Sequence, residues 1–296
     1  MTEKYHNRLL IVFAFMVLFC ISLLVLHETI GDFALYYIAG RSINNGGSAY
    51  DMFFSYSMAA AYFFRVFALL PFDVARVVFA LMNCLMYVAS VAMILFFNKA
   101  KGRWFAYPLV LSCFWLPVAE SMRVGNSDSM MLFLLTLSVL SAEKKQPVLS
   151  GFLLGVATLF KLFPIGIAMV MGLKNWRIFA VCVLTVAVSF LIPGSSGWFG
   201  AIGSVFKTPP LLSLPYYLLS QVHIGLFILY AVVIAAVTAS ICYRIRKEAN
   251  YFMFVSFAIP SVLLTMVIVE YIHLTLLAYA FYKFFFKMRV FIEDHY

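Results

Sequence analysis

A carboxylate, two adjacent tyrosines and an arginine lie within residues 31–41, in the order Gly-Asp-Phe-Ala-Leu-Tyr-Tyr-Ile-Ala-Gly-Arg. Asp32 could take a proton from an attacking hydroxyl group, which is the role of a general base. An Asp at the start of a helix can instead cap it, because its oxygen accepts the free backbone N–H groups of the first turn. Aromatic and apolar residues recur at helical spacing from Phe33, so residues 33–44 are predicted to form a short amphipathic helix along a membrane interface, with Asp32 at its start.

Further polar residues surround this helix in sequence. Residues 46–51 are rich in glycine and end at Tyr50 and Asp51. Asp51 is more typical of a turn or a cap than of a catalytic site. The candidate substrate-binding residues of this segment are Tyr36, Tyr37, Tyr50 and Asp51, and Arg41 is a candidate for binding a phosphate group.

Lys161 interrupts a long apolar stretch, residues 147–173, which also contains Gly155 and Pro164. A charge at membrane depth costs at least ~2.5 kcal/mol on insertion scales, so such a residue is a candidate for function. A lysine can also extend its alkyl chain to the membrane surface and serve no chemistry. Irregular backbone at membrane depth occurs beside cavities, and a cation there would suit a lipid-linked phosphate.

Arg123, Asn126 and Asp128 form another polar group, between two apolar stretches. The planar guanidinium of Arg123 can pair with two oxygens of a phosphate or carboxylate. Gly125 and Asn126 can also be an ordinary turn, with Asp128 capping the helix that follows.

The last polar group consists of Glu270, Tyr271 and His273. It is a candidate for binding, but a lone histidine at an interface is more often a structural hydrogen-bond partner. We predict no metal and no cofactor, because no two or three carboxylates cluster in the segments predicted to lie outside. The five cysteines all fall within apolar runs and are predicted to be small core residues.

Composition excludes a water-soluble globule, since 65% of the 296 residues are hydrophobic, 11% are charged and the mean hydropathy is +1.01. The chain is therefore predicted to be an all-α polytopic membrane protein, a single transmembrane domain over residues 1–296. The net charge of +9 reflects basic residues of cytoplasmic loops and gives no reason to expect nucleic acid as a partner.

About ten membrane segments are predicted, some of them half-length or re-entrant. They are a first helix over residues 9–26, an interfacial or re-entrant piece over 53–70, spans over 74–97, 104–119 and 129–142, a hairpin over 147–173, and spans over 178–192, 224–243, 252–269 and 274–286. External loops are expected at residues 27–54, which carry Asp32, and at 193–222. No repeat and no soluble domain is apparent.

The hairpin follows from the distribution of positive charge. If residues 147–173 crossed the membrane once, every later cluster of Lys and Arg would lie on the side opposite to the earlier clusters. If they enter and return as two half-helices, with Lys161 near the turn, most basic residues collect on one side, which is the cytoplasmic side. We therefore predict the hairpin, and both termini in the cytoplasm.

The order Gly-Asp-Phe, Tyr-Tyr, Ala-Gly-Arg, Gly and Tyr-Asp after a first transmembrane helix resembles the first external loop of glycosyltransferase family 87, polyprenyl-phosphate-dependent mannosyl and arabinosyl transferases of the GT-C superfamily. Gly-x(3)-Gly-x(5)-Lys-x-x-Pro around Lys161 resembles a second family segment. Gly125-Asn126 resembles a third, usually written Gly-Gln, and Glu270 to His273 resembles a late Trp-x-His element with Tyr in place of Trp. The aromatic-Pro-Pro element expected after the first loop is absent here, and the chain is shorter than is usual for the family.

The resemblance implies a GT-C-like bundle and an inverting glycosyltransferase of the cell (inner) membrane, with an active site facing the outside or periplasm. Asp32 would be the base, and Lys161, Arg123, Arg41 and His273 would bind the donor phosphate. Asn126, Glu270 and Tyr271 would join the substrate-binding residues. The donor would be a polyprenyl-phosphate sugar, and the acceptor a glycolipid or glycan hydroxyl of the cell envelope. A transporter or flippase of lipid-linked substrates and a non-catalytic relative are the alternatives.

Overall fold

The computed structural model describes residues 10–18, 31–52, 54–98, 109, 116–205, 224–245, 251 and 255, and these residues are helical with short connections and no strand. Residues 10–18 are helical. The further helices are α2 (Asp32–Asn44), η1 (Ala49–Met52), α3 (Met58–Phe67), α4 (Phe72–Phe97), α6 (Leu116–Arg123), α7 (Asp128–Glu143), α8 (Pro147–Phe160), α9 (Pro164–Gly172), α10 (Trp176–Ser189), α11 (Gly197–Val205) and α13 (Ile224–Ile245).

The predicted division of the stretch 147–173 into two short helices at Lys161 is confirmed. Helix α8 begins with Pro147 in its first turn and ends before Lys161, whose backbone is extended with φ −149° and ψ 140°. Pro164 then starts α9, again in the first turn, where its missing N–H costs no hydrogen bond. Two prolines and one extended residue therefore divide the apolar stretch into two short helices.

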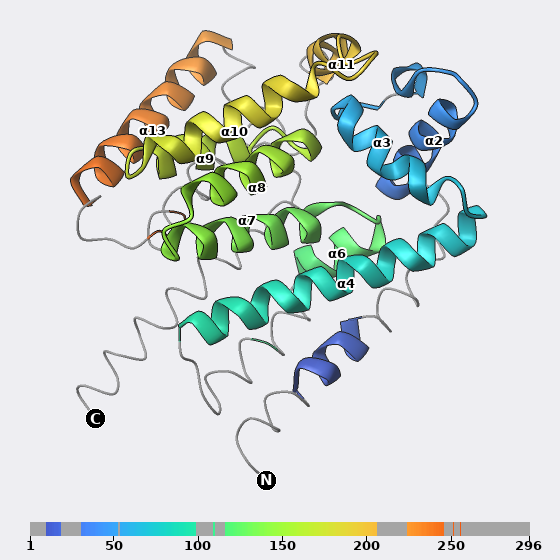
Figure 1. Ribbon diagram of the computed structural model, residues 1–296, viewed down its shortest axis with the longest axis horizontal. Helices are drawn as coiled ribbons and strands as arrows, with labels where there is room; N and C mark the ends of the chain where they lie inside the picture. Colours follow the sequence, from blue (N-terminus) through green and yellow to red (C-terminus); the bar gives the residue numbers. More distant parts are fainter. Residues whose placement is uncertain are drawn as a thin grey trace.

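Helix α8 packs between α7 and α10. It runs antiparallel to α7, because Ser138 bonds to Ser150 at 2.9 Å while Asp128, at the start of α7, meets Lys161. It runs parallel to α10 at close range, since a Cβ on Gly151 would meet Ile178 and Val181 and a Cβ on Gly155 would lie 2.5 Å from the Cβ of Thr185. Figure 1 shows these helices side by side with the long helix α4 along one face.

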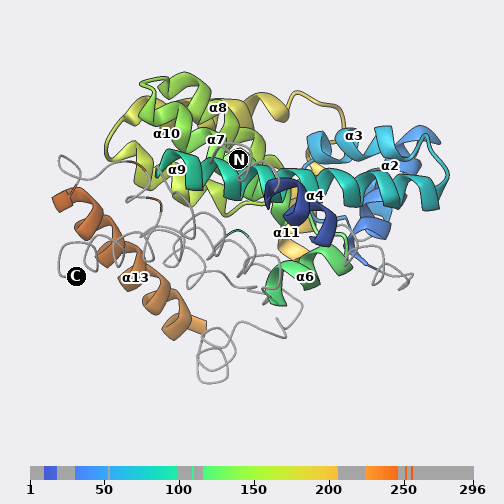
Figure 2. The same ribbon diagram turned by 90° about the horizontal axis from the view of Figure 1, so that it is seen from below.

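An aromatic cluster fixes α2 to the rest of the bundle. The ring of Tyr36 stacks on Phe64 of α3 at 4.3 Å between centroids, and Phe33 stacks on Phe79 of α4 at 4.7 Å. Phe160, the last residue of α8, meets Phe64 at 5.9 Å. Both ribbon views place α2 and α3 at the end of the molecule where α4 begins (Figures 1 and 2).

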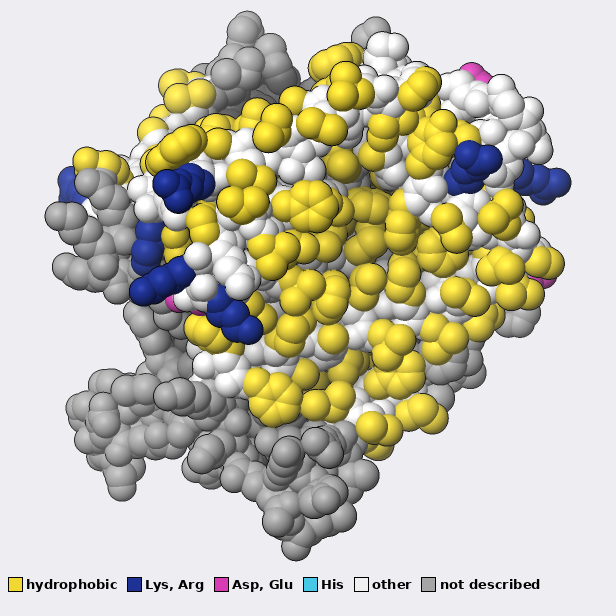
Figure 3. Space-filling model, in the orientation of Figure 1, with side chains coloured by type: hydrophobic (Ala, Val, Ile, Leu, Met, Phe, Trp, Pro, Cys, Tyr) yellow, Lys and Arg dark blue, Asp and Glu magenta, His cyan; other side chains and the backbone are white. Residues whose placement is uncertain are grey.

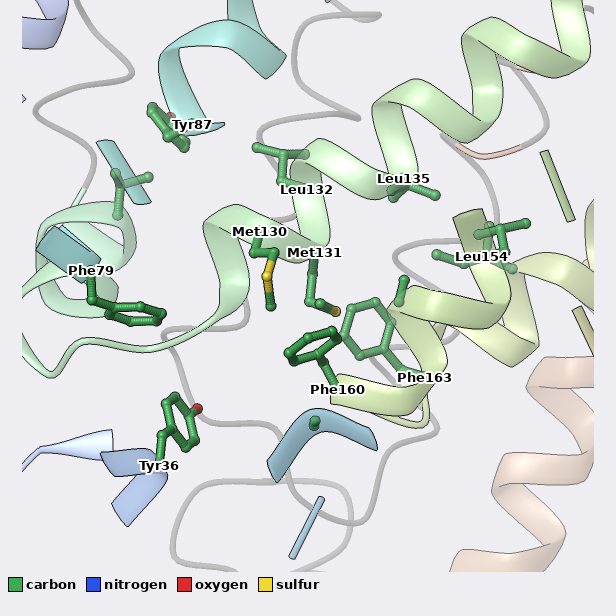
Figure 4. Packing of buried hydrophobic residues seen from close by; sticks show 14 of the residues in the cluster. Tyr36, Phe79, Tyr87, Met130, Met131, Leu132, Leu135, Leu154, Phe160 and Phe163 are labelled. Atoms are coloured by element: carbon green, nitrogen blue, oxygen red, sulfur yellow. The ribbon is translucent and has the colours of Figure 1, made fainter. Parts of the chain in front are cut away.

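The core continues from this cluster between α4, α7 and α8. Figure 4 shows Met131 of α7 pointing toward Phe160 and Phe163, and all three side chains are buried. Met130 and Leu135 of α7 and Leu154 of α8 belong to the same apolar core. The packed core therefore reaches the residues on both sides of Lys161.

The end of the bundle away from Lys161, where α7 ends and α8 begins, carries exposed positive charge. Glu143 at the end of α7 accepts a hydrogen bond from the backbone N–H of Tyr251 at 2.6 Å, and the Nζ of Lys174, after α9, lies 4.9 Å from the centroid of the Tyr251 ring. The chain thus enters α8 and leaves α9 at one end. We call Lys144, Lys145, Lys174 and Arg177 the basic end.

Several predicted elements have the predicted place, and one does not. Helices α2, α4, α7, α10 and α13 agree with their predicted ranges within a few residues. The loop predicted over residues 193–222 contains the helix α11, which is fixed by a hydrogen bond from Trp198 Nε1 to the Ser55 carbonyl at 3.2 Å. The spans predicted over 252–269 and 274–286 lie outside the described residues.

One helix of the described part, α4 with 26 residues, is long and apolar enough to cross a bilayer by itself. Shorter apolar helices are α3, α8 and α10. Figure 3 shows a face that is mostly apolar, with Lys and Arg side chains at two opposite edges. Exposed apolar residues of the described helices include Val74 and Val78 of α4, Phe152 of α8 and Leu184 of α10.

Candidate functional site

The start of α2 lies against the turn between α6 and α7. The backbone N–H of Phe33 donates to the Val124 carbonyl at 3.3 Å. Gly125 has φ +66°, a left-handed conformation that favours glycine, and a Cβ there would lie 2.7 Å from the Cβ of Phe33. A Cβ on Gly31 would collide with the Val124 carbonyl oxygen. Two glycines thus allow the contact that places Asp32 beside Asn126.

The side chain of Asp32 bonds to Asn126 and does not cap α2. The Nδ2 of Asn126 donates to the Oδ2 of Asp32 at 2.5 Å. The N-cap position is Gly31, and no side chain caps this helix. The cap interpretation of Asp32 is therefore wrong, because the N-terminal turn faces the α6–α7 turn and directs the carboxylate across to it.

Lys161 and Asp128 complete this group. The Nζ of Lys161 donates to Asn126 Oδ1 at 2.7 Å and to Asp128 Oδ1 at 2.6 Å, and the two charges form a buried ion pair. Lys161 is 8% exposed and Asp128 is fully buried. The alternative interpretation of Asp128 as a helix cap is also wrong, since α7 has no side-chain cap and the carboxylate binds Lys161. We call Asp32, Asn126, Asp128 and Lys161 the polar cluster.

The backbone of Asn126 is fixed as firmly as its side chain. Its N–H donates to the Ser121 carbonyl at 2.9 Å, and its carbonyl accepts from Asn83 Nδ2 at 3.0 Å. Asn126 and Asn83 are almost fully buried. The amide that links Asp32 to Lys161 therefore belongs to a rigid turn between two core helices.

Burial raises the pKa of Asp32 above its ordinary value, and the negative charge of Asp128 acts in the same direction. The positive charge of Lys161 and the hydrogen bond from Asn126 lower that pKa and oppose part of this shift. Asp32 is half-buried, so its carboxylate is not sealed into the core. A carboxylate with a raised pKa is a stronger base than a free aspartate and remains a candidate proton acceptor.

Two tyrosines lie beside Asp32. The hydroxyl of Tyr36 donates to that of Tyr56 at 3.2 Å. The charges of Lys161 and Asp32 both act on the hydroxyl of Tyr56. Tyr36 therefore has both a hydrogen-bonding role here and a packing role in the aromatic cluster.

The other candidates of the first loop lie elsewhere. Tyr37 is buried and donates to the Leu70 carbonyl at 2.8 Å. Asp51 accepts from the Ser48 N–H at 3.0 Å, as expected for a turn, and Tyr50 packs near Phe54. Arg41 is exposed in the last turn of α2, about 13 Å along the helix from Asp32 at 1.5 Å per residue.

Arg123 ends α6, one residue before the carbonyl that holds the start of α2, and its side chain is half-buried. Glu270, Tyr271 and His273 lie outside the described residues. In the described part of the chain no three His, Cys, Asp or Glu residues are grouped to hold a metal ion, and the prediction that none is needed stays a prediction.

Sequence reasoning missed the parts that Asp128, Asn83 and Tyr56 play in this site. Asp128 carried a usable signal, because a lysine within an apolar stretch needs an acidic partner when it is buried. Asn83 lies within the apolar helix α4, where a buried amide needs a hydrogen-bond partner. For Tyr56 the sequence holds no comparable signal.

The model of glycosyltransferase family 87 matches residues 54–270 of this chain. The matched range includes Asn126, Asp128 and Lys161 and begins after Asp32. No curated protein matches the chain.

Proposed function

The chain belongs to glycosyltransferase family 87, and we propose that it transfers a sugar from a polyprenyl-phosphate donor to a hydroxyl of a glycolipid or glycan, with Asp32 as the general base. As a member of this family it is a glycosyltransferase. The acceptor hydroxyl attacks the anomeric carbon and loses its proton to Asp32, while the bond to the phosphate oxygen breaks. One such displacement inverts the configuration at that carbon.

The observation that carries the proposal is the hydrogen bond between Asp32 and Asn126. It holds a half-buried carboxylate at the junction of α2, α7 and α8. Beside it, Lys161 and Asp128 neutralise each other's charge as an ion pair. The side chain of Asp32 therefore bonds to a neutral amide, while Lys161 bonds to Asn126 and Asp128. Such a group can accept a proton and return it to solvent after transfer.

The apolar surface supports a lipid-linked donor. Exposed Val, Leu and Phe side chains of α4, α8 and α10 suit contact with lipid chains, and Figure 3 shows the breadth of the apolar face. We propose a multi-pass protein of the cell membrane, with the basic end in the cytoplasm. The polar cluster then faces the outside, and a lipid-linked sugar reaches it sideways from the bilayer.

The departing phosphate needs positive charge, and Arg123 is the described candidate closest in the chain to the residues that hold α2. Its guanidinium can bind two phosphate oxygens at once. His273 and Arg41 remain further candidates from the sequence. The leaving group carries a single phosphate, for which side-chain cations can suffice without a metal.

The test is sugar transfer by purified Asp32→Asn in lipid nanodiscs. The probes are radiolabelled polyprenyl-phosphate mannose and polyprenyl-phosphate arabinose, with a lipid extract from cells that lack the protein as acceptor. An amide cannot take the proton at neutral pH, so the rate should fall roughly a hundred- to ten-thousand-fold. The amide oxygen can still accept from Asn126, so the protein should remain folded.

Asp51→Asn is the matched control, because it changes the other carboxylate of the same loop. The amide oxygen can keep the bond from the Ser48 N–H, so transfer should remain near the wild-type rate. Near-normal transfer by Asp32→Asn would refute the proposed mechanism. Passage of the labelled lipid across proteoliposomes without sugar transfer would favour a transporter instead.

A further inference from the structure

We infer that Asn126 is a positioning residue that fixes the orientation of the Asp32 carboxylate, and that Lys161 acts on Asp32 through Asn126 instead of binding the donor phosphate. The inference rests on the proposed role of Asp32 as base. It assigns to Asn126 and Lys161 functions that follow from which atoms donate and which accept. Asn126 bonds to both Asp32 and Lys161 through its side chain.

The orientation of the Asn126 amide is set by its neighbours. A lysine ammonium group donates hydrogen bonds and accepts none, so the atom of Asn126 that faces Lys161 must be the oxygen. The backbone N–H of Asp128 donates to the same oxygen at 3.1 Å. Two donors on Oδ1 leave the Nδ2 group to face Asp32, where it donates to Oδ2.

This arrangement makes the two oxygens of Asp32 different. Oδ2 receives the N–H of Asn126, which stabilises the ionised carboxylate and holds its plane. Oδ1 is then the oxygen for the proton of the acceptor hydroxyl. Rotation of the carboxylate would break the bond to an amide that cannot rotate with it, because Lys161 and Asp128 hold its oxygen.

Lys161 is poorly placed for a substrate. It is 8% exposed, and its ammonium already meets Asn126 and Asp128 at 2.7 and 2.6 Å. A phosphate would have to enter a buried site in which Asp128 already neutralises the charge of Lys161. The structure therefore favours Lys161 as the residue that sets the amide orientation.

The charged and titratable groups around Asp32 come from several elements. Lys161 follows α8, Asp128 begins α7, and Tyr36 of α2 and Tyr56 before α3 form the hydroxyl pair. Lys161 and Asn126 favour the ionised form of Asp32, whereas Asp128 and burial favour the protonated form. Removing the Asn126 donor should therefore raise the pKa of Asp32, and with it the pH above which Asp32 can act as a base.

The experiment is the pH profile of kcat/KM for sugar transfer, with radiolabelled polyprenyl-phosphate mannose, for wild type, Asn126→Leu and Asn126→Asp. The acid limb reports the base of the free enzyme. In Asn126→Leu the N–H donor is lost, so this limb should move to higher pH by about one unit. Asn126→Asp keeps the shape but adds a carboxylate, and it should move the limb at least as far.

Asn83→Leu is the matched control. Asn83 is also a buried asparagine and bonds to the backbone of Asn126, but no bond from it to Asp32 is described. We expect this variant to be less stable and its acid limb to stay in place. At pH values well above the limb, Asn126→Leu should recover to within about tenfold of wild type, because the ionised base is then present in both proteins.

The outcomes separate this inference from the proposed function. A uniform fall of kcat/KM at every pH in both Asn126 variants, with an unmoved limb, would show that Asn126 is merely structural and would overturn the inference. Asp32→Asn should be inactive across the whole pH range whatever the Asn126 variants do. Near-normal transfer by Asp32→Asn would instead overturn the proposed function, and the inference with it.

Discussion

The two ends of helix α7 use lysine in opposite ways. At its start, Lys161 is buried and pairs with Asp128 at 2.6 Å, next to Asn126 and Asp32. At its end, Lys144 and Lys145 are exposed. The 16 residues of α7 separate these ends by about 24 Å at 1.5 Å per residue. The same residue type is thus part of a fixed network at one end and a solvated surface charge at the other.

This difference in burial determines which charges of the chain contribute to its stability. An exposed lysine interacts weakly with its surroundings because water screens it. A buried ion pair depends on both partners, since either charge left alone in the core has lost its hydration without compensation. Single changes at the polar cluster should therefore have large effects, and equivalent changes at the basic end small ones.

The strongest test of this contrast is Lys161→Met beside Lys144→Met. Lys161→Met leaves Asp128 buried without a cation, which should lower the free energy of unfolding by about 3 to 5 kcal/mol. Lys144→Met should change it by less than ~0.5 kcal/mol. Reversible denaturation in mixed micelles gives both values.

The double variant Lys161→Met/Asp128→Asn sharpens the same comparison. If the loss comes from an unpaired charge, neutralising Asp128 should return part of the stability, so the double variant should be more stable than Lys161→Met alone. Additive losses would mean that the ion pair does not account for the difference between the two ends.

A smaller effect is expected from the glycine that brings α2 to the polar cluster. Gly125 and Gly46 both have positive φ, +66° and +79°, so an alanine at either position pays about 1 kcal/mol of backbone strain. A Cβ at Gly46 meets nothing within 4 Å, whereas a Cβ at Gly125 meets Phe33. Gly125→Ala should therefore cost about 1 to 3 kcal/mol more than Gly46→Ala in the same denaturation assay. Equal losses would contradict the close approach of α2 to the turn.

The sequence was sufficient for the elements that local rules govern. Lys161 and Pro164 divide an apolar stretch, so the hairpin of α8 and α9 followed from charge and from proline. Helix α11 escaped prediction because its glycine- and serine-rich surroundings favour a loop, whereas Trp198 anchors it through a distant carbonyl. Local composition does not register such a tertiary contact.

The polar cluster could be predicted as separate candidates and not as one network. Asp32 and Asn126 are 94 positions apart, and Asn126 and Lys161 are 35 apart. Their contact depends on α2 lying against a glycine turn and on α8 ending at the level where α7 begins. Because no periodicity in the sequence encodes these two facts, Asp128 and Asp32 were each open to interpretation as a helix cap.

The smallest effect on stability is expected from single cysteines at exposed positions of the basic end and of α2. Their labelling reports on which side of the membrane each of these two regions lies. Lys144→Cys and Arg177→Cys lie at the basic end, and Arg41→Cys lies on α2, in a background that lacks the five native cysteines. Each should change stability by less than ~0.5 kcal/mol. In intact cells a membrane-impermeant maleimide should label Arg41→Cys and should label the other two only after permeabilisation, because positive charge is retained in the cytoplasm. Labelling of Arg177→Cys but not of Lys144→Cys in intact cells would place the two ends of the α8–α9 hairpin on opposite sides of the membrane and would break the comparison, since the residues of the basic end would then not share one side.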